Sequence, residues 1–258
     1  MSSKEKLIIF TGGTAGLGLN ALEQLASNRQ NEFELPSQFA YRICIGARAA
    51  SDGKLQAHLD KICQSSPSPI DVKIDLLPLE LTSPDSIECF AQHVLSHVVS
   101  AFKKIDHMVL NAGIFLRNPQ QAVQLSDGRE FESTFFVNTL SQSLLLKRLL
   151  PAMADDGRIV MVSSKMHLDA VKGMSLFSFS SSSTMDLLTI EPPVTPSTID
   201  DYLGPKKWGG RQVYQISKLV QMHLSFILKD EIQRRWSSRT NPLVRPTVVT
   251  VSPGNPLL

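Results

Sequence analysis

A glycine-rich stretch near the start of the sequence, TGGTAGLG at residues 11–18, most constrains what this chain can fold into. The apolar run KLIIF comes directly before it, and a segment with leucines at helical spacing follows it. Glycines permit a tight turn and let the backbone approach a ligand, while a helix N-terminus offers free N–H groups and a positive dipole end. A strand, a glycine turn and a helix in this order predict an anion site suited to a pyrophosphate.

The rest of the chain alternates between apolar runs and amphipathic segments. Strands are predicted within 6–13, 41–48, 71–81, 105–113, 157–164 and 245–254. Helices are predicted within 15–28, 83–102, 127–153 and 214–236, with Ser83 as an N-cap and Pro84 in the first turn. Continuous apolar strands joined by such helices indicate a parallel sheet covered on both faces. The predicted fold class is α/β, a Rossmann-type doubly wound parallel sheet, with a single domain over residues 1–258.

Composition excludes several classes of protein. The 258 residues are 42% hydrophobic and carry a formal net charge of +2 without a long run of Lys or Arg, so nucleic acid is not an expected partner. The three cysteines stand far apart, without a C-x-x-C pair, and no metal site is predicted. An apolar stretch of about 18 residues is missing, which argues against a transmembrane segment. The default expectation is a cytoplasmic enzyme or binding protein.

Four further motifs carry chemically useful side chains. Asn111, Ala112 and Gly113 end the predicted fourth strand, and Asn138 is an amide in the middle of an apolar helix. Ser163 and Ser164 end the fifth strand. Tyr214 and Lys218 are four residues apart, so they share one face of a helix. A tyrosine has a pKa near 10, and a neighbouring ammonium lowers it toward neutrality, as reversible proton transfer to a carbonyl oxygen requires.

In this order, T-G-x-x-x-G-x-G, N-A-G, Asn, Ser, Y-x-x-x-K and P-G resemble the short-chain dehydrogenase/reductase family over residues 8 to 254. The resemblance implies a nicotinamide cofactor and a hydride transfer. The catalytic residues that it implies are Asn138, Ser164, Tyr214 and Lys218, with Ser163 as the nearby alternative to Ser164. The cofactor-binding residues that it implies are Thr11, Gly12, Thr14, Ala15, Gly16, Leu17, Gly18, Arg48, Glu80, Leu81, Asn111, Ala112, Gly113, Tyr214, Lys218, Pro253 and Gly254.

The end of the second strand indicates which nicotinamide cofactor to expect. Members of the family that prefer NAD place an Asp where this chain has Ala47, and Arg48 follows it. A guanidinium fork matches a phosphate, so NADP(H) is the predicted cofactor. An exposed arginine at a strand end is the structural alternative. The resemblance places Glu80 and Leu81 in the adenine pocket.

A long segment separates the motif serines from the motif tyrosine. Residues 165–213 are rich in Ser, Pro and Gly, and Tyr214 follows Ser164 by 50 residues, whereas most family members have about a dozen. This spacing resembles the branch with retinol dehydrogenases and 3-ketosteroid reductases, which implies a bulky hydrophobic substrate such as a steroid, retinoid, polyketide or terpenoid. The apolar residues of the insertion that are expected to line or cover the site are Leu176, Phe177, Phe179, Leu187 and Leu188. A surface flap is the alternative.

The sequence stops soon after Pro253 and Gly254, which begin the loop under the nicotinamide in this family. We therefore expect a C-terminally short domain, either natural or truncated. The predicted function is an NADPH-dependent reductase of a carbonyl, reversible as an alcohol dehydrogenase, and a homodimer is possible. Two alternatives remain at this point: a non-catalytic nucleotide-binding or scaffold protein, and a reductase of a C=C or C=N bond.

Overall fold

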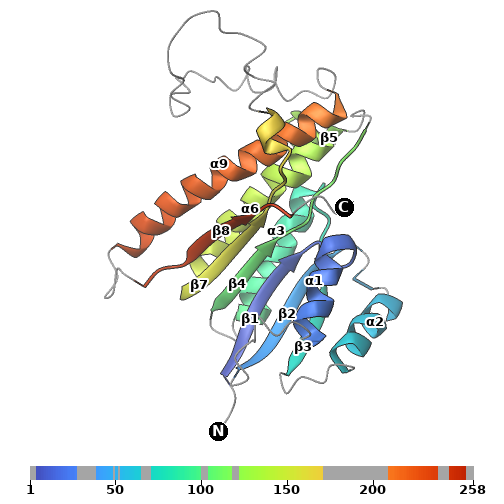
Figure 1. Ribbon diagram of the computed structural model, residues 1–258, viewed down its shortest axis with the longest axis vertical. Helices are drawn as coiled ribbons and strands as arrows, with labels where there is room; N and C mark the ends of the chain where they lie inside the picture. Colours follow the sequence, from blue (N-terminus) through green and yellow to red (C-terminus); the bar gives the residue numbers. More distant parts are fainter. Residues whose placement is uncertain are drawn as a thin grey trace, which may run out of the picture.

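A six-stranded parallel sheet forms the centre of the computed structural model, with the strand order β3-β2-β1-β4-β7-β8 (Figure 1). The structure describes residues 4–27, 39–48, 50–51, 53–64, 71–99, 104–117, 122–170, 209–237 and 244–253. The strands of the sheet are β1 (Lys4–Thr11), β2 (Phe39–Ala47), β3 (Val72–Pro78), β4 (Ile105–Leu110), β7 (Met153–Val162) and β8 (Thr247–Val251). This architecture confirms the α/β doubly wound fold that the sequence predicts.

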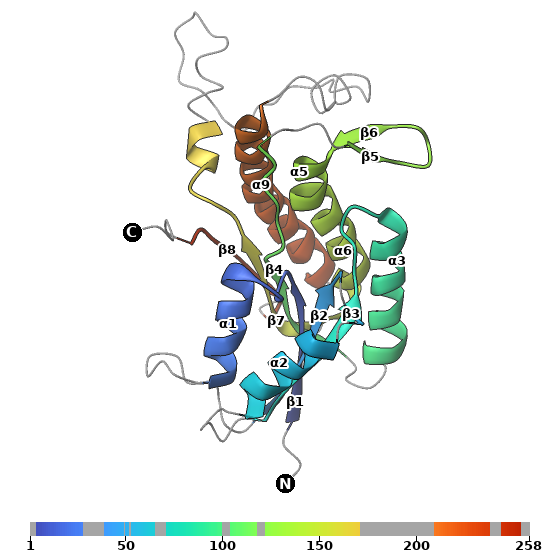
Figure 2. The same ribbon diagram turned by 90° about the vertical axis from the view of Figure 1, so that its right-hand side faces the viewer.

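Two hydrophobic cores lie on opposite faces of the sheet, because successive strand residues point to opposite sides. Ile8 and Phe10 of β1 pack with the buried leucines of α1 (Gly16–Ser27) and α2 (Gly53–Gln64). Leu7 and Ile9 pack on the other face. The helices of that second face are α3 (Pro84–His93), α6 (Ser141–Leu149) and α9 (Gly210–Trp236), and Figure 2 shows them on the side away from α1.

The structure confirms one helix start and corrects another. The Ser83 side chain accepts a hydrogen bond from Ser86 N, as the predicted N-cap of α3 requires. The helix expected from residue 127 begins instead at α5 (Ser133–Phe135) and continues through the π-helical turn η2 (Phe136–Leu140) into α6. Residues before α5 form a hairpin of β5 (Ala122–Gln124) and β6 (Glu130–Glu132), whose turn contains Gly128 at a φ of 85°. That left-handed backbone cannot continue a right-handed helix.

Helix α2 was missed by the reading of the sequence. Only Leu59 of this helix is buried, and Leu55 and Ile62 pack at the margin of the core. Because the apolar stripe of this polar helix is so narrow, the hydrophobic periodicity of its sequence is weak. None of the described helices is long and apolar enough to cross a membrane.

The strand order reverses direction between β1 and β4, which are neighbours in the sheet although β2 and β3 separate them in sequence. In open parallel sheets, ligands bind at the carboxyl ends of the strands where the order reverses. The residues that follow β1 and β4 are the glycine-rich stretch and the N-A-G motif. The fold therefore brings together the two motifs on which the predicted cofactor site depends.

Candidate active site

The glycine-rich turn after β1 forms a tight cradle at the start of α1. Gly12 has a φ of 70°, and a Cβ added to it would lie 2.7 Å from Ala112 Cα. A Cβ on Gly18 would lie 2.0 Å from the Gly12 carbonyl oxygen. These distances exclude any side chain at the two positions, so the turn can close only with glycine. Around Gly16, by contrast, an added Cβ would meet no atom within 4 Å, so this side of the turn is open to a ligand.

Polar side chains support this cradle through hydrogen bonds on the side that faces the protein interior. Asn111 Nδ2 donates hydrogen bonds to Gly12 O at 2.8 Å and to Thr11 O at 3.3 Å. Thr11 is completely buried, and its Oγ1 accepts from Ala112 N at 3.1 Å. Gln142 Nε2 donates to Ala112 O at 3.2 Å. Thr11 and Asn111, both predicted to bind the cofactor, thus join the ends of β1 and β4 and give the cradle its shape.

A cavity of about 1310 Å³ extends from this cradle to helix α9. On the cradle side it is lined by Gly12, Thr14, Ala15, Gly16, Leu17 and Gly18. Arg48, Glu80 and Leu81, which were predicted to bind the cofactor, line the cavity beyond the ends of β2 and β3. Arg48 is exposed, whereas Glu80 Oε1 accepts hydrogen bonds from Thr82 N at 2.9 Å and Thr82 Oγ1 at 2.8 Å. Glu80 therefore also closes the turn after β3.

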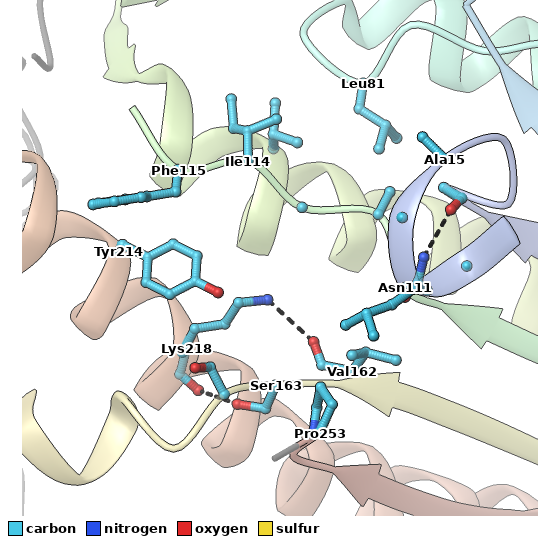
Figure 3. Close-up of a pocket in the computed structure, with 18 of the residues that line it drawn as sticks. Ala15, Leu81, Asn111, Ile114, Phe115, Val162, Ser163, Tyr214, Lys218 and Pro253 are labelled. Carbon is cyan, nitrogen blue, oxygen red and sulfur yellow. Dashed lines mark hydrogen bonds between the residues drawn. The ribbon is translucent and has the colours of Figure 1, made fainter. Parts of the chain in front are cut away.

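Tyr214 and Lys218 line the opposite end of the cavity. Figure 3 shows the Tyr214 hydroxyl pointing toward Lys218 Nζ, with Phe115 beside the tyrosine ring. Lys218 Nζ lies 5.6 Å from the centre of that ring and donates hydrogen bonds to Val162 O at 3.1 Å and Gln221 Oε1 at 2.9 Å. Burial lowers the pKa of Lys218 to about 8. With this pKa the ammonium is still mostly protonated at neutral pH, and its charge faces the tyrosine hydroxyl.

Asn138 connects the loop after β4 to helix α9. It is completely buried in η2, and its Oδ1 accepts a hydrogen bond from Ile114 N at 2.8 Å. Its Nδ2 donates to Ile114 O and to Ser217 Oγ, both at 3.0 Å. Every polar atom of the amide therefore has a partner, so the residue carries no unpaired burial cost. A π-helical turn is frequent at functional sites, where it re-aims side chains.

The two serines after β7 have different surroundings. Ser163 is 3% exposed, and its Oγ donates to Lys218 O at 3.0 Å, which ties the end of β7 to α9. Ser164 is half-buried and lines the cavity, and its Oγ accepts from Met166 N at 3.3 Å. A hydroxyl can accept a hydrogen bond and donate its own proton at the same time. The Ser164 hydroxyl can therefore still donate to a ligand in the cavity, whereas the Ser163 hydroxyl already donates to Lys218 O.

Three residues of the site were missed by the sequence reasoning. The exposed ring of Phe115 lies 5.2 Å from the ring of Tyr214, at 60°. Ser217 is buried, and its Oγ donates to Tyr214 O at 2.7 Å. Gln221 is buried behind Lys218. The available signal was polarity: Ser217 and Gln221 are uncharged polar residues on the helix face that carries Lys218.

Some predicted residues fall outside what the structure describes. Pro253 and Gly113 line the cavity, but Gly254 lies outside the described residues. The same holds for residues 171–208, which include Leu176, Phe177, Phe179, Leu187 and Leu188. Among the described residues, no group of three or more His, Cys, Asp or Glu is arranged to hold a metal ion.

The described part of the site fits a dinucleotide. The cradle offers a helix N-terminus and glycines beside which a phosphate can approach the backbone. The cavity continues from there past Asn111 and Gly113 to the Lys218 ammonium, so it connects the glycine cradle to the Tyr214–Lys218 pair. At its far end, Ser164 lines the cavity together with Tyr214 and Lys218 of helix α9, and the buried Asn138 is bonded to Ser217 of the same helix.

Comparison with family models shows which family the chain belongs to. The model of the short chain dehydrogenase family matches residues 44–188, and the chain belongs to this family. The match includes the N-A-G motif and both serines. The glycine cradle and the Tyr214–Lys218 pair lie outside the matched residues, so their assignment depends on the geometry described above.

Several proteins from fungi and plants are similar to this chain. The short-chain dehydrogenase sdnK of Sordaria araneosa is 25% identical over 90% of this chain and 61% of its own length. The short chain dehydrogenase/reductase mfmJ of Annulohypoxylon moriforme is 30% identical over 85% of this chain and 54% of its own length. The short-chain dehydrogenase TIC 32 B, chloroplastic, of Brassica napus is 26% identical over 98% of this chain and 66% of its own length. The chain therefore spans between about half and two thirds of these three relatives.

Solved structures share the fold at lower identity. A blue fluorescent protein from a metagenomic library, solved in complex with NADPH, superposes with a TM-score of 0.58 at 18% identity, covering 96% of this chain and 74% of that one. A short chain dehydrogenase from Burkholderia cenocepacia in complex with NADP gives a TM-score of 0.56 at 17% identity, covering 98% of this chain and 76% of that one. These similarities support the Rossmann-like architecture.

Proposed function

We propose that this protein is an NADP(H)-dependent reductase of a carbonyl group on a bulky hydrophobic compound, working reversibly as an alcohol dehydrogenase. The observation that carries the proposal is the buried Lys218 ammonium beside Tyr214, at one end of a cavity whose other end is a glycine cradle. A scaffold protein that only binds a nucleotide has no use for a cation buried next to a tyrosine, since burial without a carboxylate partner costs stability.

The proposed reaction divides the work between the cofactor and the protein. When bound, the reduced nicotinamide supplies a hydride to the carbonyl carbon. Ser164 Oγ donates a hydrogen bond to the carbonyl oxygen and polarises it. Tyr214 Oη gives that oxygen a proton, so the products are an alcohol and the oxidised cofactor, and the phenolate left on Tyr214 is stabilised by Lys218 until solvent reprotonates it.

The choice of NADP(H) depends on Arg48. The side chain lies at the end of β2, lines the cavity and is exposed, and Ala47 beside it presents no carboxylate to repel a phosphate. The two similar structures solved with NADPH and NADP are consistent with this preference. In the proposed complex, the pyrophosphate contacts the glycine-rich turn at Thr14, Ala15, Gly16 and Leu17. The adenine packs against Leu81.

The wall around Tyr214 supports the proposed substrate class. This part of the cavity is lined by Ile114, Phe115, Leu116, Met166 and Leu168. Phe115 is 48% exposed and Leu168 is 53% exposed, so both have apolar surface available to a ligand. Covering such surface contributes about 25 cal/mol per Å². Such a wall suits the proposed steroid-like, retinoid-like, polyketide or terpenoid carbonyl compounds.

Cofactor oxidation against a substrate panel tests the proposal. NADPH and NADH should be titrated first, with tight binding expected for NADPH. Oxidation of NADPH would then be followed with bulky ketones, and in parallel with enones and imines of similar size. Faster oxidation with ketones supports the carbonyl reaction, and oxidation with enones or imines alone shifts the assignment to C=C or C=N reduction. A protein that binds neither nucleotide overturns the proposal. The predicted cytoplasmic location and the homodimer remain predictions.

A further inference from the structure

Gln221 is a buried polar residue next to the site whose presence is not explained by the packing of the fold. It lies one turn after Lys218 on α9, is completely buried, and does not line the cavity. Its Oε1 accepts a hydrogen bond from Lys218 Nζ at 2.9 Å. Its Nε2 is buried without a hydrogen-bond partner within the described structure. An unpaired buried donor costs about 1–3 kcal/mol, so an apolar residue of the same size would serve the fold better.

The ammonium needs a fixed position if it is to act on Tyr214. A lysine has four rotatable side-chain bonds and three donors, and an unrestrained one samples many rotamers. Lys218 Nζ has two neutral acceptors, Val162 O at 3.1 Å and Gln221 Oε1 at 2.9 Å. A Cβ on Gly113 would lie 3.4 Å from the same nitrogen, so the ammonium faces the N-A-G turn as well as the tyrosine. The two acceptors leave one N–H of the ammonium directed to the cavity.

We propose that Gln221 is a positioning residue, whose side-chain carbonyl holds the Lys218 ammonium in place and keeps it charged between Tyr214 and the cofactor cavity. The inference rests on the proposed function in one respect, since it concerns the same proton donor. It adds a residue that contacts neither the cavity nor the reacting groups. Val162 O cannot be altered by mutation, so Gln221 is the acceptor through which this charge can be tuned.

The surroundings of Lys218 make a titration informative. Helix α9 contributes Tyr214 and the neutral Gln221, β7 contributes the Val162 carbonyl, and the Asn138 amide of η2 lies near the same Gly113 position as the ammonium. Tyr214 is thus the titratable side chain among the described groups packed around the ammonium. The lowered pKa of Lys218 has burial as its cause, so a change in its acceptor should move that pKa without competing ion pairs.

Two substitutions at Gln221 should move the titration in opposite directions. Gln221→Met keeps the length of the side chain but removes the acceptor, so we expect the pKa of Lys218 to fall by about one unit. Gln221→Glu places a carboxylate against the ammonium, so we expect that pKa to rise by at least a similar amount. Gln233→Met, on an exposed position of the same helix, is the matched control and should change nothing. A residue with only a packing role would not give opposite shifts.

The first measurement is a lysine-selective NMR titration of the cofactor-free protein, with the Lys218 signal assigned by its loss in Lys218→Met. Thermal melting checks that each variant is folded. Unchanged Lys218 titration in the folded Gln221 variants overturns the inference, and so do shifts of the same sign. If Gln221→Met fails to fold, the upward shift in Gln221→Glu decides the matter alone. This readout needs no activity, so it tests Gln221 even if the proposed function fails.

The second measurement is the pH profile of turnover with NADPH and a bulky ketone. Ketone reduction needs the ammonium, so kcat should fall as pH rises through the pKa of Lys218. In Gln221→Met this basic limb should move down by about one pH unit, giving about a fivefold lower kcat than the parent at the parent's midpoint, with KM within about threefold. In Gln221→Glu it should move up. A raised KM together with an unchanged basic limb of the kcat profile would contradict a positioning role. It would mean that Gln221 only maintains the shape of the pocket.

Discussion

The two ends of the cavity are built in different ways. At the cradle end, the shape comes from the backbone: Gly12 and Gly18 permit contacts that no side chain could make, and the supporting Thr11, Asn111 and Gln142 bond to backbone atoms or to each other. At the catalytic end, the shape comes from side chains that are buried and polar, above all Asn138 and Lys218. The cradle is one turn of backbone supported by the residues after β4 and by α6, whereas the catalytic end is formed by side chains from separate segments.

This difference predicts different responses to substitution. A backbone cradle should fail when volume is added, and it should lose cofactor affinity and stability together. A buried polar network should fail when a functional group is removed, and it should lose turnover while cofactor binding persists. The following predictions test that separation.

The largest effect is expected from Tyr214→Phe. The ring and its packing on Phe115 remain, and only the proton donor is lost, so kcat should fall by about a thousandfold. NADPH affinity should stay within about threefold of the parent. Stopped-flow or steady-state oxidation of NADPH with a bulky ketone measures the first quantity, and calorimetry the second. Substantial turnover in this variant would exclude the proposed carbonyl mechanism.

A pH-dependent stability is expected next, from Lys218. The pKa of its buried ammonium is about 8, below the ordinary 10.5. Between these values the unfolded chain binds more protons, so the free energy of unfolding rises with pH through this window, by about 3 kcal/mol in total. Lys218→Met lacks that rise. Urea unfolding of the parent and of Lys218→Met from pH 7 to pH 10.5 gives the difference in their free energies of unfolding at each pH. The titration of all other groups cancels in this difference. A constant difference would mean that the ammonium is solvated in the folded state.

Adding a methyl group to the cradle is expected to have a smaller effect on stability. In Gly18→Ala the new Cβ would lie 2.0 Å from Gly12 O, so the turn must shift, at a cost of about 1–3 kcal/mol in unfolding free energy. NADPH affinity should fall at least as strongly. Gly53→Ala is the matched control, because a Cβ there meets nothing within 4 Å. If both variants bind NADPH like the parent, the cradle is not the phosphate site.

The same contrast explains how much could be predicted from the sequence. The strand–glycine–helix unit is encoded within about 25 consecutive residues, and its periodicity and glycines predicted β1, the turn and α1 correctly. The four catalytic candidates were predicted by motif order; Ser164, Tyr214 and Lys218 line one cavity, and Asn138 lies buried behind it, bonded to Ser217. What the motifs left out are the partners: Gln221 behind Lys218, Ser217 on Asn138, and Phe115 against Tyr214.

The failures have a physical origin as well. Helix α2 buries one residue, so its stripe is too narrow for a periodic signal. The helix start at 127 was wrong because Gly128 and the short strand β6 interrupt a segment whose composition favours a helix. Hydrogen-bond partners such as Gln142 and Thr11 lie 131 residues apart, and no local pattern reports a contact at that separation.

Cofactor choice should respond to Arg48 without affecting the catalytic end. In Arg48→Ala the guanidinium that faces the adenosine side is lost, so NADPH affinity should fall about tenfold, equal to about 1.4 kcal/mol, while NADH affinity stays the same. Arg245→Ala, an exposed arginine at the opposite edge of the sheet, is the control. Calorimetric titration with both cofactors measures the ratio. Equal losses for NADPH and NADH would assign Arg48 to a general electrostatic role.

The smallest effect is expected at Phe115, which tests whether the apolar wall belongs to the catalytic end. Its ring is 48% exposed and lies 5.2 Å from the Tyr214 ring. Phe115→Leu removes the aromatic pair, worth about 0.5–1.5 kcal/mol, but keeps an apolar side chain. We expect KM for a bulky ketone to rise about threefold while NADPH affinity is unchanged. Phe226→Leu makes the same substitution at a position of α9 that is 61% exposed and outside the cavity lining, and should leave KM unchanged. A change in NADPH affinity with an unaltered KM would instead place Phe115 with the cofactor, and the two ends of the cavity would then not be separable at this residue.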